Sequence, residues 1–289
     1  MGKNNLVLSD DFGLKLTPSA LFEIYRHYGI SDMDFLAASP LYSCYQYPGR
    51  ELRKQALSKW KEALGASCIQ IFSFTPMPHG YPVNLSDTNP ETRARSLRYY
   101  LDYMEDAVFL DADYLTVHPG WYYLEEGKAQ GTDAMMNSLF ALLERAEEKK
   151  IPLLLTPSNA EQTNTLQTYE DIARLFEKAA SPWLSLAIDL NLLMANGENP
   201  AWYANTPEIR TACLDIQTDL SGLDALMEYT GKHFPPTLPI RLHPIGTVDA
   251  LQPKQYLSSI QNIMDCLYKT NSLSRIFPQP GLSQPPVQH

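Results

Sequence analysis

Five short apolar runs in this sequence each end on a polar side chain that could take part in catalysis or bind a metal ion. The terminal residues follow one another at steps of 26 to 38 residues and are His118, Thr156, Asp189, Asp215 and His243. Carboxylates and imidazoles act as general acids and bases, and they also bind divalent ions. Asp189, Asp215 and His243 together offer two carboxylates and one imidazole, a set that suits Mn²⁺, Fe²⁺ or Zn²⁺. His118 would complete a fuller metal site.

The spacing of these runs fits a repeated unit of one strand, one helix and two loops. Three earlier apolar runs, at residues 6–9, 34–37 and 68–74, bring the strand candidates to eight. Near-continuous apolar strands are typical of parallel sheets that are buried on both faces. Alternating strands and helices favour closure into a (β/α)₈ TIM barrel, in which the carboxyl ends of the strands carry the chemistry. We therefore predict that the five polar residues line one pocket at the barrel mouth.

Helical patterns lie between the strand candidates. Asn89 followed by Pro90 predicts a helix start, and so does Thr168 with Asp171 three residues later. The first of these helices has an apolar stripe at helical spacing, formed by Leu97, Leu101, Met104 and Val108. We expect residues 1–271 to form a single barrel domain. The proline-rich tail at 272–289 is expected to be extended and able to lie on a neighbouring subunit of a homo-oligomer.

Composition excludes several classes of partner. The net charge is −10 and no basic stripe is visible, which disfavours binding to nucleic acid. The sequence shows neither a signal peptide nor an apolar run of the roughly 18 residues that a membrane span needs. The four cysteines are scattered and form no CxxC pair, so we expect reduced thiols and a cytoplasmic location.

Other polar residues near the predicted strand ends are candidates for contact with a ligand. Trp121 could stack on a sugar face or simply pack its loop, and Gln217 shares a strand face with Asp215. The remaining candidates each have an ordinary alternative role: a helix cap for Asp10, a turn for His79 and a loop turn for Asp219.

From about Thr75 to Gly222 the chain resembles the xylose isomerase-like TIM barrels. This group includes sugar phosphate isomerases and epimerases and the AP endonuclease 2 family, and the ketose 3-epimerases, including the fructoselysine type, are nearest. The resemblance rests on the order and spacing of short segments, at residues 75–85, 90–97, 117–120, 153–157, 187–189 and 214–216, with Asp219.

The resemblance implies four metal ligands at strand ends: a glutamate, an aspartate, a histidine and a second glutamate. In the epimerases the two glutamates also exchange protons with the substrate carbon, while a divalent ion polarises the neighbouring oxygens. Carried over by position, these ligands become Thr156, Asp189, Asp215 and His243. Only Asp189 keeps the family type, so the resemblance implies a degenerate metal site that holds Mn, Zn or Mg weakly or holds no metal.

The sequence therefore predicts a sugar isomerase/epimerase-like protein that acts on or binds a small polyhydroxylated ligand. If the protein is catalytic, Asp189, Asp215 and His243 orient the ligand or a metal, and His243 or His118 moves the proton, while Thr156 contacts the ligand. The alternative is a repurposed barrel that binds carbohydrate without catalysis. An abasic-site endonuclease is disfavoured, because its three-zinc site needs more histidines and its substrate is polyanionic.

Overall fold

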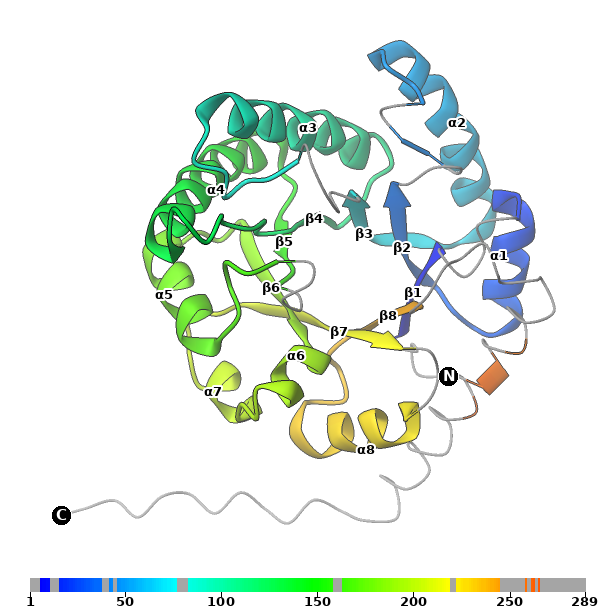
Figure 1. Cartoon of the computed structure of the whole chain (residues 1–289). Helices are drawn as coiled ribbons and strands as arrows, with labels where there is room; N and C mark the ends of the chain where they lie inside the picture. Colours follow the sequence, from blue (N-terminus) through cyan, green and yellow to red (C-terminus); the bar gives the residue numbers. More distant parts are fainter. Residues whose placement is uncertain are drawn as a thin grey trace.

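The barrel is formed by parallel strands that pair in chain order and close on themselves. The computed structural model describes residues 6–10, 16–37, 42–43, 46–76, 83–157, 163–218 and 222–244, with residues 258, 261–262 and 265. Within these residues β1 to β8 form a closed barrel, and β8 pairs with β1. Helices surround the strands (Figure 1). The predicted (β/α)₈ barrel is confirmed.

Each predicted strand overlaps an observed one. The strands are β1 (Leu6–Ser9), β2 (Asp32–Ala37), β3 (Gln70–Pro76), β4 (Tyr114–Val117), β5 (Leu153–Leu155), β6 (Leu184–Asp189), β7 (Thr211–Thr218) and β8 (Ile240–Pro244). The helices are α1 (Pro18–His27), α2 (Arg50–Ser67), α3 (Pro90–Phe109), α4 (Lys128–Lys149), α5 (Tyr169–Ala179), α6 (Leu190–Ala195), α7 (Pro200–Ala204) and α8 (Leu223–His233). None of the described helices combines the length and apolarity that a membrane span requires.

The two predicted helix starts are confirmed by their caps. The side chain of Asn89 accepts a hydrogen bond from the backbone N–H of Glu91 at 2.9 Å, and that of Thr168 accepts one from Asp171 at 3.3 Å. These caps satisfy backbone donors that the first turn of a helix leaves without a partner.

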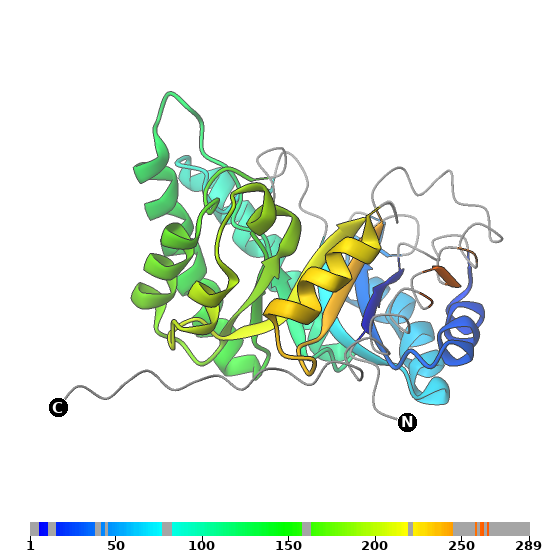
Figure 2. The same ribbon diagram turned by 90° about the horizontal axis from the view of Figure 1, so that it is seen from below.

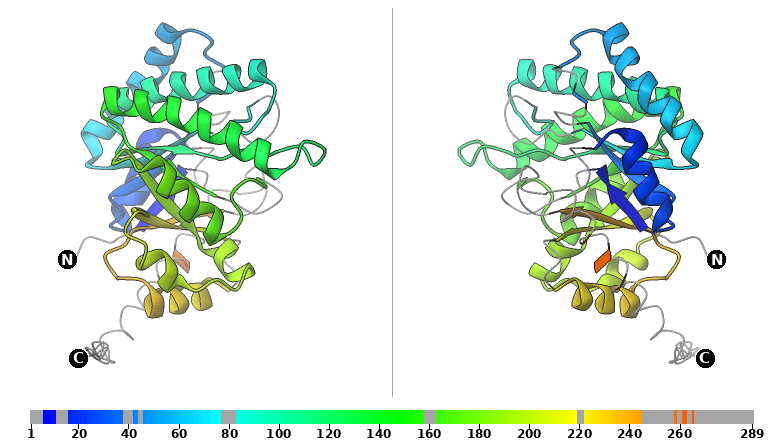
Figure 3. Two further views of the ribbon diagram at one scale, coloured as in Figure 1. Left: turned by 90° about the vertical axis from the view of Figure 1, so that its left-hand side faces the viewer. Right: turned by 90° about the vertical axis from the view of Figure 1, so that its right-hand side faces the viewer.

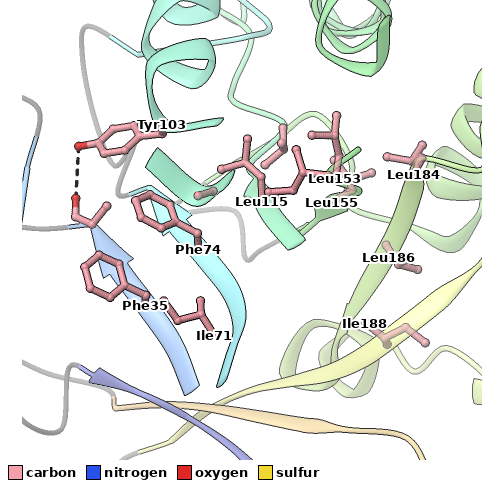
Figure 4. Packing of buried hydrophobic residues seen from close by; sticks show 14 of the residues in the cluster. Phe35, Ile71, Phe74, Tyr103, Leu115, Leu153, Leu155, Leu184, Leu186 and Ile188 are labelled. Atoms are coloured by element: carbon pink, nitrogen blue, oxygen red, sulfur yellow. Dashed lines mark hydrogen bonds between the residues drawn. The ribbon is translucent and has the colours of Figure 1, made fainter. Parts of the chain in front are cut away.

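The predicted apolar face of α3 is displaced around the helix. Leu97, Leu101 and Val108 are only partly buried, and of the predicted stripe only Met104 is fully buried. The buried face carries Tyr99, Tyr100, Tyr103 and Ala107 instead. Tyrosine rings bury more surface than leucine when the hydroxyl finds a partner, and the Tyr103 hydroxyl lies 3.4 Å from the carbonyl oxygen of Ala37 (Figure 4).

The main core lies between the strands and the surrounding helices. Residues such as Phe35, Phe74, Leu115, Leu153 and Leu186 fill it (Figure 4). On one side of the barrel α8 covers β7 and β8 (Figures 1 and 2). A second, smaller apolar cluster joins side chains from opposite sides of the closed barrel, such as β1 and β5, which places it inside the barrel: Val7, Phe72, Leu154, Ala187 and Cys213.

Candidate functional site

A polar layer lies inside the barrel, on the carboxyl-terminal side of the small apolar cluster. Because side chains alternate along a strand, Asp215 shares the interior face of β7 with Cys213, and Asp189 shares that of β6 with Ala187. The register pairs Asp189 with Asp215 and Asp215 with Arg241, and it pairs Gln217 with His243. Arg241 therefore stands in the same row of strand partners as the two aspartates, and His243 lies two residues further along β8.

The guanidinium of Arg241 is the centre of this layer and is 1% exposed. Its Nε and Nη2 atoms donate to the two carboxylate oxygens of Asp215 at 3.1 and 2.7 Å. Its Nη groups also donate to Thr116 at 3.0 Å, Thr156 at 3.1 Å and Ser73 at 3.2 Å, with longer contacts of 3.4 Å to Asp34 and Thr75. One side chain thus connects β8 with β2, β3, β4, β7 and the end of β5.

His243 lies beside the same two carboxylates. Its Nε2 atom is 3.0 Å from Asp215, and its Nδ1 atom is 3.9 Å from Asp34. Burial favours the neutral imidazole, but the carboxylate of Asp215 outweighs burial and raises the pKa of His243. Burial also opposes ionisation of Asp215, yet Arg241 and His243 hold the pKa of that carboxyl well below its usual range. The cluster is two carboxylates facing a guanidinium and an imidazole whose pKa is raised.

Asp189 differs from Asp215 because its carboxylate lacks an arginine partner among the described contacts. Its Oδ1 atom accepts a hydrogen bond from the backbone of Leu192 at 2.9 Å and caps α6. Burial, and next the charge of Asp215, raises the pKa of Asp189 to about 7, against the backbone hydrogen bond that lowers it. Asp189 is therefore a buried carboxyl group that can gain or lose a proton near neutral pH.

The four positions implied by the family resemblance do not fit a divalent ion as they stand. Both oxygens of Asp215 and the hydroxyl of Thr156 already accept hydrogen bonds from Arg241. A metal ion bound to them would lie beside the guanidinium charge, which repels it. Within the described residues no group of three or more His, Cys, Asp or Glu side chains is arranged to hold a metal ion.

Three asparagines hold the backbone around the mouth. Asn84 accepts from the N–H of Trp121 at 3.0 Å and donates to its carbonyl at 2.8 Å. Asn164 and Asn191 make the same pair of bonds to the backbones of Tyr122 and Gln217, at 2.8 and 3.1 Å and at 3.0 and 3.1 Å respectively. We call these three side chains the asparagine clamps. They fix the loop after β4, whose tip projects beyond the helices (Figure 3), and the end of β7.

The other predicted site residues lie in different surroundings. His118 follows β4, is half-buried, and its backbone N–H donates to the hydroxyl of Tyr100 at 3.1 Å. Trp121 and Gln217 are half-buried, at the clamped segments. Asp10 is fully buried and accepts a hydrogen bond from the backbone of Leu36 on β2 at 2.9 Å, a contact between strands. His79 and Asp219 lie outside the described residues, as does the tail from residue 272.

Sequence analysis gave no role to Arg241 or Asp34, which are central to the polar layer. A signal for Arg241 was present, since it precedes His243 by two residues and therefore shares its strand face. Asp34, a charged residue within an apolar strand, was a second signal.

The profile of the family described as xylose isomerase-like TIM barrel matches residues 22–221, which is more than half of the chain. The chain belongs to this family. No curated protein matches the sequence of this xylose isomerase-like barrel.

Many solved structures share the fold. A 3-keto-D-glucoside 4-epimerase from E. coli has a TM-score of 0.69 at 14% identity, over 93% of this chain and 100% of that one. A D-psicose 3-epimerase with D-tagatose from Clostridium cellulolyticum H10 has a TM-score of 0.72 at 11% identity, over 92% and 98%. The IOLI protein with a zinc atom has a TM-score of 0.67 at 14% identity, over 95% and 99%.

Proposed function

We propose that this xylose isomerase-like barrel binds a small polyhydroxylated, carbohydrate-like ligand at its carboxyl-terminal mouth without a bound metal ion. The similar folds named above support a sugar ligand, because two of those proteins are sugar epimerases. Asp189 and His243 supply the polar groups at the strand ends, and the side chain of His243 is 17% exposed. The clamped segments at Trp121 and Gln217 would supply an aromatic ring and an amide at the rim.

The observation that carries the metal-free part of the proposal is the position of Arg241. Its guanidinium donates hydrogen bonds to the oxygen atoms of Thr156 and Asp215. These residues stand at two of the four positions that the resemblance assigns to metal ligands. A ligand at the mouth would therefore be oriented by hydrogen bonds from neutral and charged side chains. Arg241 itself is too deeply buried to touch the ligand.

A metal-independent proton transfer is the second candidate function, and the pKa of Asp189 favours it. A carboxyl group with a pKa of about 7 can serve as either general acid or general base at neutral pH. In this case Asp189 would exchange the proton with the ligand and His243 would stabilise the developing negative charge. His118 is the next residue to test as a proton carrier.

Ligand binding is tested with purified protein by ligand-observed NMR, using D-fructose, D-psicose and D-tagatose with and without a phosphate group. We expect at least one sugar to bind, and Asp189→Asn together with His243→Gln to weaken that binding by about tenfold or more, as expected for two lost polar contacts. The matched control is Asp133→Asn on the exposed surface of α4, which should bind as the unmodified protein does. Absence of binding, or equal binding by the double variant, contradicts the proposal.

Metal-dependent 3-epimerisation of these free ketoses is expected to be absent. Abstraction and return of a proton on opposite faces require two bases, and the Thr156 hydroxyl is a poor base that already accepts a hydrogen bond from Arg241. A positioned base typically contributes about 10²–10⁴ in rate. The assay is incorporation of solvent deuterium at the substrate carbon, followed by NMR with added Mn²⁺. Rapid incorporation that depends on Mn²⁺ would refute this expectation.

The cytoplasmic location expected from the cysteines stays a prediction.

A further inference from the structure

We propose that the guanidinium of Arg241 supplies the permanent positive charge inside this barrel, at the position where the family resemblance implies a divalent metal ion. It balances the buried carboxylates, gathers the side chains of the polar layer and thereby excludes a metal. The inference concerns the interior of the barrel and does not depend on which ligand the mouth binds.

The first support is the geometry around Arg241. A metal ion in a barrel collects oxygen ligands from several strands, and the Arg241 side chain does the same with its N–H groups. Its partners are two carboxylates and four hydroxyl groups, from Asp34, Ser73, Thr75, Thr116, Thr156 and Asp215. The paired bonds to Asp215 have the fork geometry that arginine forms with carboxylates and lysine does not.

The second support is the charge inside the barrel. The side chains of Asp34 and Asp215 are 0% and 5% exposed, and a buried carboxylate needs a positive partner. Arg241 keeps its charge at every accessible pH, so it supplies that partner permanently. Thr75 and Ser73 donate their hydroxyl protons to the Oδ1 atom of Asp34, whereas its buried Oδ2 atom has no hydrogen-bond partner among the described residues.

The third support comes from the neighbours that could compensate for a lost arginine. Cys213 lies next to the polar layer, on the side away from the mouth. Burial raises the pKa of its thiol to about 12, so the thiol is neutral. His243 lies at the mouth side and contacts Asp215, while its nitrogen nearest Asp34 remains 3.9 Å away. Removal of the guanidinium therefore leaves Asp34 and Asp215 with too little positive charge, and an external cation can supply it.

The experiment compares the unmodified protein, Arg241→Ala and Arg241→Lys after dialysis against EDTA and after addition of Mn²⁺ or Zn²⁺. Arg241→Lys is the matched control, because it keeps the charge. We expect the unmodified protein and Arg241→Lys to contain well under one equivalent of metal and to keep the same Tm with and without it. Arg241→Ala is expected to have a lower Tm without metal, which added metal raises by about 4 °C or more, with up to one equivalent bound. The double variant Arg241→Ala, Asp215→Asn should neither bind the metal nor gain Tm when metal is added.

Two results would overturn the inference. One is a full equivalent of metal in the unmodified protein that Asp215→Asn removes. The other is an Arg241→Ala variant that takes up no more metal than Arg241→Lys. If Arg241→Ala does not fold, the double variant Asp34→Asn, Arg241→Gln leaves a single buried carboxylate and is compared with Arg241→Lys in the same way. No sugar is present in these measurements, so their outcome is independent of ligand binding at the mouth.

Discussion

At the scale of single residues, Asp189 links the pH to the stability of the barrel. Its folded-state pKa is raised to about 7, above an ordinary value of 3.8, mainly by burial. Between about pH 4 and 7 the unfolded chain has therefore lost this proton while the folded protein retains it. The free energy of unfolding falls as the pH rises through that window, and the full cost is present above pH 7. The difference of about three pKa units corresponds to at most about 4 kcal/mol.

Asp189→Asn is expected to remove this fall in the free energy of unfolding with rising pH, because asparagine stays neutral and is an equally good N-cap for α6. In urea unfolding, the variant should gain stability relative to the unmodified protein by about 1–2 kcal/mol at pH 5 and by up to about 4 kcal/mol at pH 8. Asp133→Asn, an exposed change in α4, serves as the control and should alter neither value. Equal stability of Asp189→Asn and the unmodified protein at pH 8 would show that Asp189 is already ionised without cost.

The polar layer marks the limit of what residue patterns could predict. The strand-end positions of Asp189 and Asp215 followed from the apolar runs, and the structure brings Asp215 and His243 together. The role of Arg241 could not be predicted in the same way. Its nearest partner along the chain is 26 residues away and its farthest, Asp34, is 207 residues away. Contacts at such separations depend on the register of the closed barrel, which sequence periodicity does not specify.

At the scale of elements, the loop after β4 depends on one glycine. Gly120 has a φ of +85°, a conformation that residues with a side chain rarely adopt, and a Cβ there would overlap the side-chain oxygen of Asn84. That oxygen is the acceptor of the clamp on Trp121. The glycine is therefore required both by its backbone conformation and by the clamp.

Gly120→Ala is expected to cost more stability than Gly127→Ala. Gly127 is the N-cap of α4 and has a similar φ of +83°, but nothing lies within 4 Å of a Cβ at that position. Gly127→Ala should therefore show the backbone strain alone, about 1–3 kcal/mol. Gly120→Ala should add the loss of the Asn84 hydrogen bonds, about 1 kcal/mol or more each. Both are measured by urea unfolding, and equal losses for the two variants would mean that the clamp adds nothing.

Secondary structure was more predictable than the packing of individual helix faces. The helix starts at Asn89 and Thr168 were readable because a cap satisfies local backbone donors. The face of α3 was not, because aliphatic residues and one methionine were taken as the apolar stripe, whereas the largest buried side chains are three tyrosines. Whether a tyrosine is buried depends on a partner for its hydroxyl, such as the carbonyl of Ala37 for Tyr103, and that partner lies on another element.

At the scale of the whole molecule, the tail beyond residue 272 is expected to contribute little to the barrel. It contains Pro278, Pro280, Pro285 and Pro286, which donate no backbone hydrogen bonds, and few apolar residues. Deletion of residues 279–289 should shift the Tm by less than about 1 °C, because a segment that buries little surface stabilises little. Light scattering after size-exclusion chromatography gives the mass before and after deletion. A lower Tm together with a smaller mass would place the tail on a neighbouring subunit.

The long reach of Arg241 also has a consequence for the order of folding. Its partners precede it by 26, 85, 125 and up to 207 residues, so the chain must be nearly complete before they can meet. During synthesis, Asp34 leaves the ribosome long before the arginine that balances it. A half-barrel that ended after β4 would enclose that carboxylate without its cation, at a cost that discourages early closure. Slow assembly through contacts so distant in sequence is typical of such folds. We therefore expect the first strands to close into the barrel only after β8, with Arg241, has been made.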